Sequence, residues 1–211
     1  MKPFIQKDKD IHPVDAYWIP TSGIKGFGIK LIRKLRNYYR RWFQNKNYIF
    51  MHSGPFEPPV NANLKIVRYD RFDDIPNTVK DAILTHEGIV SLENDRFEMN
   101  HAATMWVGFV DDQPALIKLS RYGKDFKRWL IDLNDNDIVI FRGRTFAEFR
   151  GLGLQSAASK HMTFTLLQNG GKAYCDCSIH NLPSIRSISK AGYTLIGTKK
   201  PITKKQAFGV D

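Results

Sequence analysis

Cysteine is scarce in this chain of 211 residues, which contains only Cys175 and Cys177. Two residues apart on a strand, their side chains would point to one face about 7 Å apart, too far for an easy disulfide. Such free thiols indicate a reducing compartment. A metal site would recruit Asp176 and His180, but no second ligand pair with zinc-like spacing occurs, so no metal is predicted.

Long hydrophobic runs are also absent, and the first residues show no signal-peptide pattern. The longest uncharged apolar-rich stretch is residues 102–110, whereas a helix that crosses a bilayer needs roughly 20 such residues. Near the N-terminus, Lys2, Lys7 and Lys9 are followed by aspartates rather than by an apolar segment. With 42% hydrophobic and 12% aromatic residues, the composition is that of a globular protein, which we expect to be cytoplasmic.

Acidic residues are missing between Asp15 and Glu57, and residues 1–50 hold 11 Lys and Arg against 3 Asp. Over residues 28–45, apolar and aromatic side chains recur at spacings of three and four, with basic side chains on the other side. The pattern predicts a cationic amphipathic helix. Its apolar set is Leu31, Ile32, Leu35, Tyr38, Tyr39, Trp42 and Phe43, and its basic set is Lys30, Arg33, Lys34, Arg36, Arg40 and Arg41.

Three kinds of contact suit this helix. Adsorption to an anionic membrane surface would make the protein peripheral at the inner face of the membrane. Docking of the apolar side on the domain or on another subunit is an equally favoured alternative, and contact with nucleic acid is the least favoured.

A proline-dense segment follows the extension. Residues 53–59 have the composition of a linker and cannot continue a helix or a central strand. We therefore expect an N-terminal extension over residues 1–60, which holds the amphipathic helix and the linker, and a folded domain over residues 61–211.

Strands and helices alternate along this domain. Strands are expected at residues 64–69, 105–110, 115–120 and 129–133, and a helix at 72–85. A strand at 137–146, a helix at 154–168, a strand at 173–179, a short helix after Pro183 and a final strand follow. The order predicts an α/β (α+β) fold with a mixed sheet.

The turn from the strand at 137–146 to the helix at 154–168 contains Phe149-Arg150-Gly151-Leu152-Gly153-Leu154-Gln155. Two glycines at such a turn let bare backbone N–H groups come close to a ligand, and the helix N-terminus favours negative charge. This motif predicts a phosphate cradle.

A second motif, Asn181-Leu182-Pro183-Ser184-Ile185-Arg186-Ser187-Ile188-Ser189-Lys190-Ala191-Gly192-Tyr193, follows the strand at 173–179. The two motifs together resemble the acyl-CoA-binding half of the GNAT superfamily of N-acetyltransferases. The loop of that family reads Arg/Gln-x-x-Gly-x-Gly/Ala, and its later segment reads Asn-x-x-Ala/Ser and then Gly-Phe/Tyr. The matching residues are Arg150, Gly153 and Gln155 in the loop, and Asn181, Ser184, Gly192 and Tyr193 in the later segment.

The resemblance covers roughly residues 63–199 and implies a GNAT-like, mostly antiparallel central sheet flanked by helices. It also implies acetyl-CoA or another acyl-CoA as co-substrate, with the loop amides on the pyrophosphate and a strand edge beside the pantetheine arm. Asn181 would bond the pantetheine, brace the separated strands or cap its own helix. The donor-binding residues implied are Phe146, Ala147, Arg150, Gly151, Leu152, Gly153, Leu154, Gln155, Asn181 and Ser184.

The chain departs from the family pattern at two positions. Gln155 stands where the family usually has Gly or Ala, which would crowd the last amide of the cradle. Ile188 stands where many members carry a Tyr that protonates the departing thiolate, and an aliphatic side chain cannot donate a proton. Ser187, the neighbour of Ile188, is left as a candidate for relaying a proton through water.

Transfer to an amine also requires a base that takes a proton from the incoming ammonium. His180 is the first candidate, because imidazole is the side chain that titrates closest to neutral pH. Asp176 and Glu148 are further candidates, and a chain of water molecules is the alternative to all three.

We therefore expect an enzyme that moves an acetyl or another acyl group from acyl-CoA to a small-molecule amine by direct attack on the thioester. If the basic helix binds membrane, an amino sugar or another amine of an envelope pathway is the favoured acceptor. One alternative is an acyltransferase that uses an acyl carrier protein as donor. The other is a non-catalytic module that senses acyl-CoA or binds nucleic acid, which Ile188 keeps open.

Overall fold

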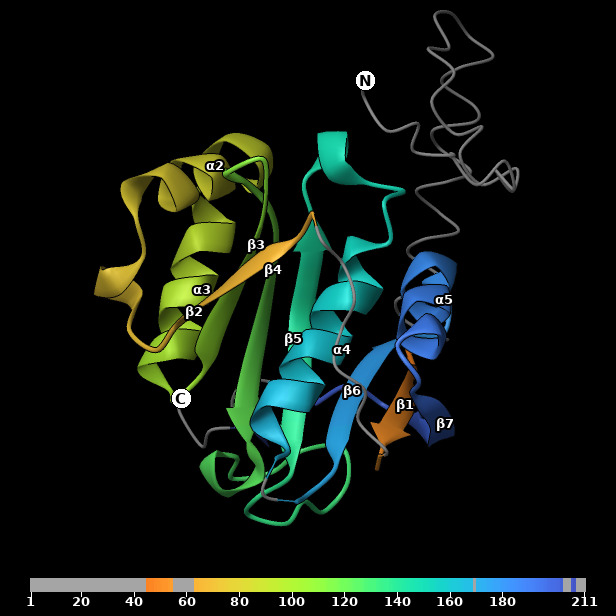
Figure 1. Cartoon of the computed structure of the whole chain (residues 1–211). Helices are drawn as coiled ribbons and strands as arrows, with labels where there is room; N and C mark the ends of the chain where they lie inside the picture. Colours follow the sequence, from red (N-terminus) through yellow and green to blue (C-terminus); the bar gives the residue numbers. More distant parts are fainter. Residues whose placement is uncertain (1–44, 55–62, 169, 203–205, 208–211) are drawn as a thin grey trace, which may run out of the picture. The chain divides into compact units, whose positions relative to one another are not determined.

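A seven-stranded mixed sheet runs through the protein, with the strands in the order β2-β3-β4-β5-β6-β1-β7 (Figure 1). The computed structural model describes residues 45–54, 63–168, 170–202, 206 and 207. In this part of the chain, five of the six neighbouring strand pairs are antiparallel, and β5 and β6 are parallel. The predicted mixed, mostly antiparallel sheet is thus confirmed. The strands are β1 (Asn47–His52), β2 (Lys65–Tyr69), β3 (Thr104–Val110), β4 (Gln113–Tyr122), β5 (Ile138–Thr145), β6 (Ala173–Ser178) and β7 (Thr194–Lys199).

The α-helices are α2 (Asn77–Glu87), α3 (Ile89–Asn100), α4 (Leu154–Leu166) and α5 (Leu182–Lys190). Where one helix was expected at 72–85, there is a 3-10 turn, η2 (Phe72–Asp74), before α2. The break occurs because the residue before a proline disfavours the α conformation: Ile75 is extended, and Pro76 is the N-cap of α2.

Strand β1 comes from residues that the sequence analysis assigned to the N-terminal extension. It pairs antiparallel with β6 on one side and with β7 on the other, and Ile49 and Phe50 are buried in it. The compact unit of the structure starts at Lys46. The expected helix at 28–45, apart from Asn45, and residues 55–59 of the expected linker lie outside the described residues.

The strand expected at 129–133 is not formed, and these residues follow an irregular path. Trp129 is buried in a cluster with Ile49, Val139 and Tyr174, and Leu130, Ile131 and Leu133 pack against this cluster. The apolar residues of the segment thus cover the sheet instead of extending it.

The helices cover the two faces of the sheet. Val79 and Ile83 of α2 and Leu92 and Met99 of α3 pack with Ile117 and Leu119 of β4. On the other face, Leu154 and Ala158 of α4 pack with Leu116, which is the expected consequence of side chains alternating along β4. Met162 of α4 belongs to a second cluster on this face, against which Ile185 and Ile188 of α5 pack.

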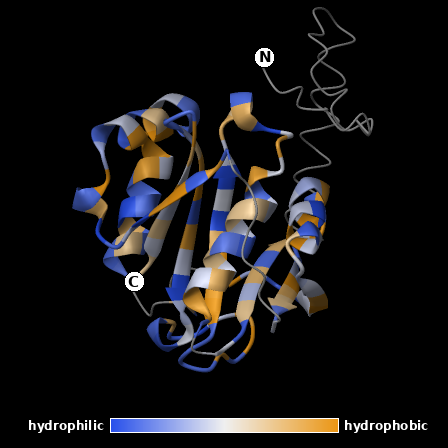
Figure 2. Cartoon of the chain, in the orientation of Figure 1, coloured by the Kyte–Doolittle hydropathy of each residue, from blue (hydrophilic) through white to orange (hydrophobic). Residues whose placement is uncertain are grey.

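Strands β5 and β6 separate soon after they begin. Their parallel pairing is limited to Ile138 with Ala173 and Val139 with Tyr174, although β5 continues to Thr145 and β6 to Ser178. The start of β5 is hydrophobic, and its C-terminal end is hydrophilic (Figure 2). Beyond Val139, the edge of β5 that faces β6 has no strand partner in the described part of the chain. The facing edge of β6 likewise has none there beyond Tyr174.

Candidate functional site

The glycine loop lies between β5 and α4, at the end where β5 and β6 have separated. Gly151 and Gly153 have φ angles of +83° and +72°, and Gly153 is the N-cap of α4. A Cβ added to either glycine would meet nothing within 4 Å. The glycines therefore serve the backbone conformation and leave open space above the loop. No acceptor among the described residues takes the backbone N–H groups of residues 151–156, which leaves them available to a ligand.

Residues around the loop hold it in place. Phe146 and Leu154 are buried. Arg150 donates from Nε to the carbonyl of Thr145 over 3.1 Å, and Gln155 donates from Nε2 to Oγ1 of Thr145 over 2.8 Å. The Gln155 side chain thus turns back to β5.

Ala147, Arg150 and Leu152 are exposed beside the glycines. The structure brings together eight of the predicted donor-binding residues, which are Phe146, Ala147, Arg150, Gly151, Leu152, Gly153, Leu154 and Gln155.

The second motif forms α5 and its ends. Asn181 accepts the backbone N–H of Ser184 at Oδ1 over 3.2 Å, so it caps the helix. A contact of Asn181 or Ser184 with pantetheine remains a prediction. Tyr193 is buried, and its hydroxyl lies 2.7 Å from Oγ1 of Thr163. Ile188 packs against the apolar cluster beneath α5.

The four candidate proton-transfer residues lie on different elements. Ser187 is half-buried on α5. The Nε2 atom of His180 is buried and has no hydrogen-bond partner among the described residues. Asp176 of β6 accepts a hydrogen bond from Nδ2 of Asn47, and burial raises the pKa of its carboxyl group against the lowering effect of that bond.

Glu148 has a side-chain partner that the sequence analysis missed. Its Oε1 lies 3.2 Å from Nε2 of His86, in the last turn of α2, and the His86 ring stacks on Phe146 with 4.6 Å between ring centroids. Glu148 and His86 thus lie side by side near the end of β5. A carboxylate at this position would attract the ammonium group of an acceptor.

A charged cluster that joins α2 and α3 to β5 was also missed. Asp95 of α3 is fully buried and pairs with Arg142 at 3.0 Å and with Arg144, both of β5, and Arg144 also lies 2.6 Å from Glu87 of α2. Arg142 has a φ of +50°, a left-handed conformation that is uncommon for a residue other than glycine. The cluster ties α2 and α3 to the separated part of β5.

Cys175 and Cys177 are free thiols on β6, as predicted. Both belong to or contact the apolar cluster on the α4 and α5 side of the sheet. Burial raises the pKa of both thiols, that of Cys177 to about 11, so neither is activated as a nucleophile.

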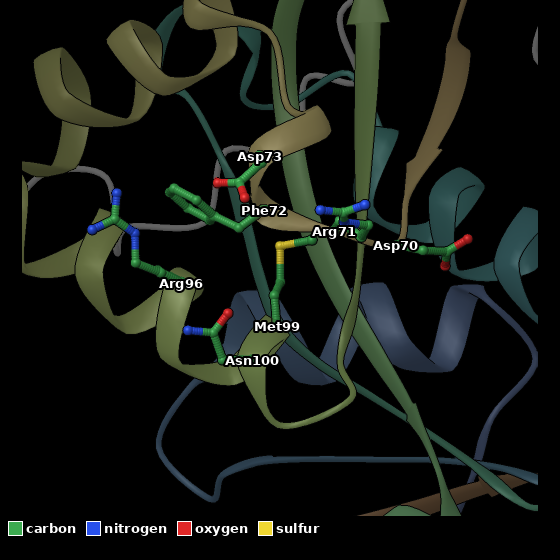
Figure 3. Close-up of a pocket in the computed structure, with 7 residues that line it drawn as sticks. All are labelled: Asp70, Arg71, Phe72, Asp73, Arg96, Met99 and Asn100. Atoms are coloured by element: carbon green, nitrogen blue, oxygen red, sulfur yellow. The ribbon is translucent and has the colours of Figure 1, made fainter.

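A pocket of about 360 Å³ lies between the turn after β2 and α3 (Figure 3). It is lined by Asp70, Arg71, Phe72, Asp73, Arg96, Met99 and Asn100. No predicted site residue lines it. Among the described residues, no helix is both long and apolar enough to cross a membrane.

Comparisons with known proteins bear on the fold. No family model and no curated protein matches the chain. A protein from Novosphingobium aromaticivorans, assigned to the GNAT family of acetyltransferases, is similar in structure with a TM-score of 0.52 and 13% identity, over 73% of this chain and 61% of that one. A tandem GNAT protein of the clavulanic acid pathway has a TM-score of 0.52 and 13% identity, over 73% of this chain and 51% of that one.

A third similar structure is the aminoglycoside acetyltransferase AAC(6')-Ib, solved with coenzyme A and kanamycin. It has a TM-score of 0.52 and 17% identity, over 65% of this chain and 88% of that one. This chain thus spans about half to three fifths of the first two relatives and most of the third. The likeness, with the sheet order and the loop geometry, shows that the chain has the GNAT fold.

Proposed function

We propose that this protein is an N-acyltransferase that moves an acetyl or another acyl group from acyl-CoA to an amine. One observation carries the proposal: a glycine loop with open backbone amides begins α4 beside the separated ends of β5 and β6. The geometry fits a pyrophosphate, because Gly151 and Gly153 leave the approach free and the N-terminus of α4 favours an anion. Arg150 adds positive charge to this site.

The edge of β5 suits the pantetheine arm. Beyond Val139 this edge has no strand partner on the β6 side, so its backbone groups are available to pair with the amides of an extended ligand. A backbone N–H on this edge would also stabilise the oxyanion that forms when the amine attacks the thioester. Positioning of donor and acceptor supplies most of such a rate enhancement.

The acceptor in this proposal is a small-molecule amine, with an amino sugar as the first candidate. The similar structure of AAC(6')-Ib holds kanamycin, which supports an acceptor of this class. His180, Asp176 and Glu148 remain the proposed bases, and Glu148 would act together with its neighbour His86. Contact of residues 28–45 with a membrane stays a prediction.

Calorimetric titration of acetyl-CoA into the full chain tests the donor site. We expect micromolar binding by the wild type and its loss in Gly153→Asp, whose carboxylate would crowd the cradle and repel the pyrophosphate. Gly170→Asp is a matched control, because Gly170 also has a positive φ and open space but lies beyond the other end of α4. Absence of binding by folded wild type, or equal loss in both variants, would contradict the proposal.

Release of the free thiol with a panel of amino sugars, aminoglycosides and polyamines tests turnover. Release that depends on an amine and is lost in Gly153→Asp supports the enzyme. Binding without turnover of any amine would instead support a module that senses acyl-CoA, and turnover with a carrier-protein donor alone would support the second donor class.

A further inference from the structure

Lys118 is a buried lysine in the middle of β4. The residue is 6% exposed, and its Nζ donates to Oγ of Ser159 on α4 over 2.7 Å. No salt bridge among the described residues involves it. The ammonium group has three N–H donors and is shielded from water. Among the described residues, it bonds one hydroxyl group and no carboxylate.

The ammonium group lies where β5 and β6 have separated. The pairing of β4 with β5 shifts between Ile117, opposite Arg144, and Leu119, opposite Phe141, so Lys118 faces the bulge at Arg142 and Gly143. A Cβ added to Gly143 would lie 3.3 Å from Nζ of Lys118 and 2.8 Å from Oε1 of Gln155. Gly143 is exposed and lies beyond the last residue of β5 that pairs with β6.

On the β6 side, the thiol of Cys175 interacts electrostatically with Lys118, and Cys175 follows Tyr174, the last residue of β6 that pairs with β5. These contacts place Ser159 and Gln155 of α4, Gly143 of β5 and Cys175 of β6 beside Lys118. Gly143, Ser159 and Gln155 have no charged side chain. The thiol of Cys175 is also uncharged at neutral pH, because burial raises its pKa.

Such a site is costly for the fold. Burial of an ammonium group without a counter-charge is unfavourable, and an apolar side chain of similar length would fill the same space without that cost. Burial accordingly lowers the pKa of Lys118 to about 8. A proton that is held weakly at this position is suited to transfer.

We propose that Lys118 is the proton donor to the thiolate that leaves the acyl donor, the role for which the chain has Ile188 in place of the family's hydroxyl group. The inference rests on the proposed function. The amine nitrogen attacks the carbonyl carbon, the C–S bond breaks, and its electron pair goes to sulfur. Sulfur then takes a proton from the Lys118 ammonium, giving the amide and the free thiol. The proton that the amine loses passes to solvent through the base, and a proton from solvent restores the Lys118 ammonium group, so the overall reaction consumes no proton.

The acidities of the two partners match. A free thiol has a pKa of about 8.5, so a proton passes from a group with a pKa of about 8 to such a thiolate at little cost in either direction. The hydrogen bond to Ser159 orients the ammonium group on α4. Ser159 is in this account a positioning residue.

A comparison of leaving groups separates proton donation from a structural role. Acyl transfer to one amine is measured with acetyl-CoA and with S-phenyl thioacetate, whose aryl thiolate is stable without a proton. In Lys118→Met we expect kcat with acetyl-CoA to fall on the order of 100-fold, and the rate with the aryl donor to change by less than about threefold. Lys160→Met, an exposed lysine next to Ser159 on α4, is the matched control and should behave as wild type.

Equal losses with both donors, or no loss with acetyl-CoA, would overturn the inference. A wild type that transfers no acyl group to any amine would instead contradict the proposed function.

A second measurement needs no turnover. The thiol of CoA bound to the full chain is titrated by its thiolate absorbance in the ultraviolet. We expect the bound thiol to have a lower pKa in wild type than in Lys118→Met, because the ammonium group stabilises the thiolate. Identical titration curves in two folded proteins that both bind CoA would overturn the inference.

Discussion

Gln155 donates from Nε2 to Oγ1 of Thr145 over 2.8 Å and so joins the first turn of α4 to the last residue of β5 across the glycine loop. This bond explains how the chain accommodates a glutamine where the GNAT pattern has a small residue. The side chain is used to brace the loop.

Removal of this brace should weaken donor binding moderately. In Gln155→Ala we expect the affinity for acetyl-CoA to fall about two- to tenfold, because one hydrogen bond of this kind contributes roughly 0.5–1.5 kcal/mol. Calorimetric titration measures the change. Gln168→Ala removes a glutamine that bonds the carbonyl of Phe164 near the other end of α4, and its affinity should equal that of wild type. A loss of the same size in both variants would contradict the brace.

Tyr193→Phe tests the buried hydroxyl pair behind α5. The variant loses the bond to Thr163, whose hydroxyl keeps its bond to the carbonyl of Ser159 at 2.7 Å. The free energy of unfolding should therefore fall by only about 1 kcal/mol. Urea unfolding followed by circular dichroism measures it. Tyr69→Phe is the control, because Tyr69 is half-buried and its hydroxyl has no hydrogen bond among the described residues. A larger loss of unfolding free energy in Tyr69→Phe than in Tyr193→Phe would refute the bond between Tyr193 and Thr163.

Asp95→Asn should be among the most damaging single changes for stability. The fully buried carboxylate pairs with Arg142 and Arg144, and its neutralisation removes the counter-charge of Arg142 and leaves Arg144 with Glu87 alone. We expect a loss on the order of 3 kcal/mol. Asp70→Asn breaks an exposed pair with Arg68 and should cost less than about 1 kcal/mol. Similar unfolding midpoints for the two variants would count against a structural role for Asp95.

The pH dependence of stability provides a test of Lys118 that is independent of any ligand. Its pKa is lowered from 10.5 to about 8 by burial, so between these pH values the unfolded chain binds more protons than the folded one. The stability of wild type relative to Lys118→Met should therefore rise across this window.

Between pH 8 and pH 10.5 the stability of wild type relative to Lys118→Met should rise by up to about 3 kcal/mol, since each pKa unit corresponds to about 1.4 kcal/mol. Denaturant unfolding of both proteins at pH 7 and pH 10 measures the difference. A difference that stays constant with pH would show that the ammonium group is not desolvated in the folded protein.

The loop and the helix after it were predictable because their determinants are close together in the chain. Gly151 and Gly153 adopt positive φ angles, and α4 starts at Leu154 as expected. Asn181 caps α5 through Ser184, three residues away. Capping, glycine conformations and hydrophobic periodicity act over a few residues, so the spacing in the sequence is sufficient to recognise them.

Strand β1 was not predictable in the same way. Its residues have a strand-like composition, but they lie next to a basic segment and before a proline-rich one, and they were assigned to the extension. The hydrogen bond between Asn47 and Asp176 joins residues 129 positions apart. Nothing in the local pattern specifies which sheet edge an isolated strand will join, because the partner edges are formed by β6 and β7.

The amino-acid sequence alone was enough to predict the order of most strands and helices from residue 64 onward, the glycine loop and the GNAT-like sheet. Only the folded structure showed that β5 and β6 separate after two paired positions, that Lys118 reaches Ser159 41 residues away, and that Asp95 meets two arginines of β5. For Lys118, the available signal was a lysine within the apolar run Ala-Leu-Ile-Lys-Leu. Burial and charge pairing are properties of packed elements, so they depend on contacts between distant residues that a local pattern does not contain.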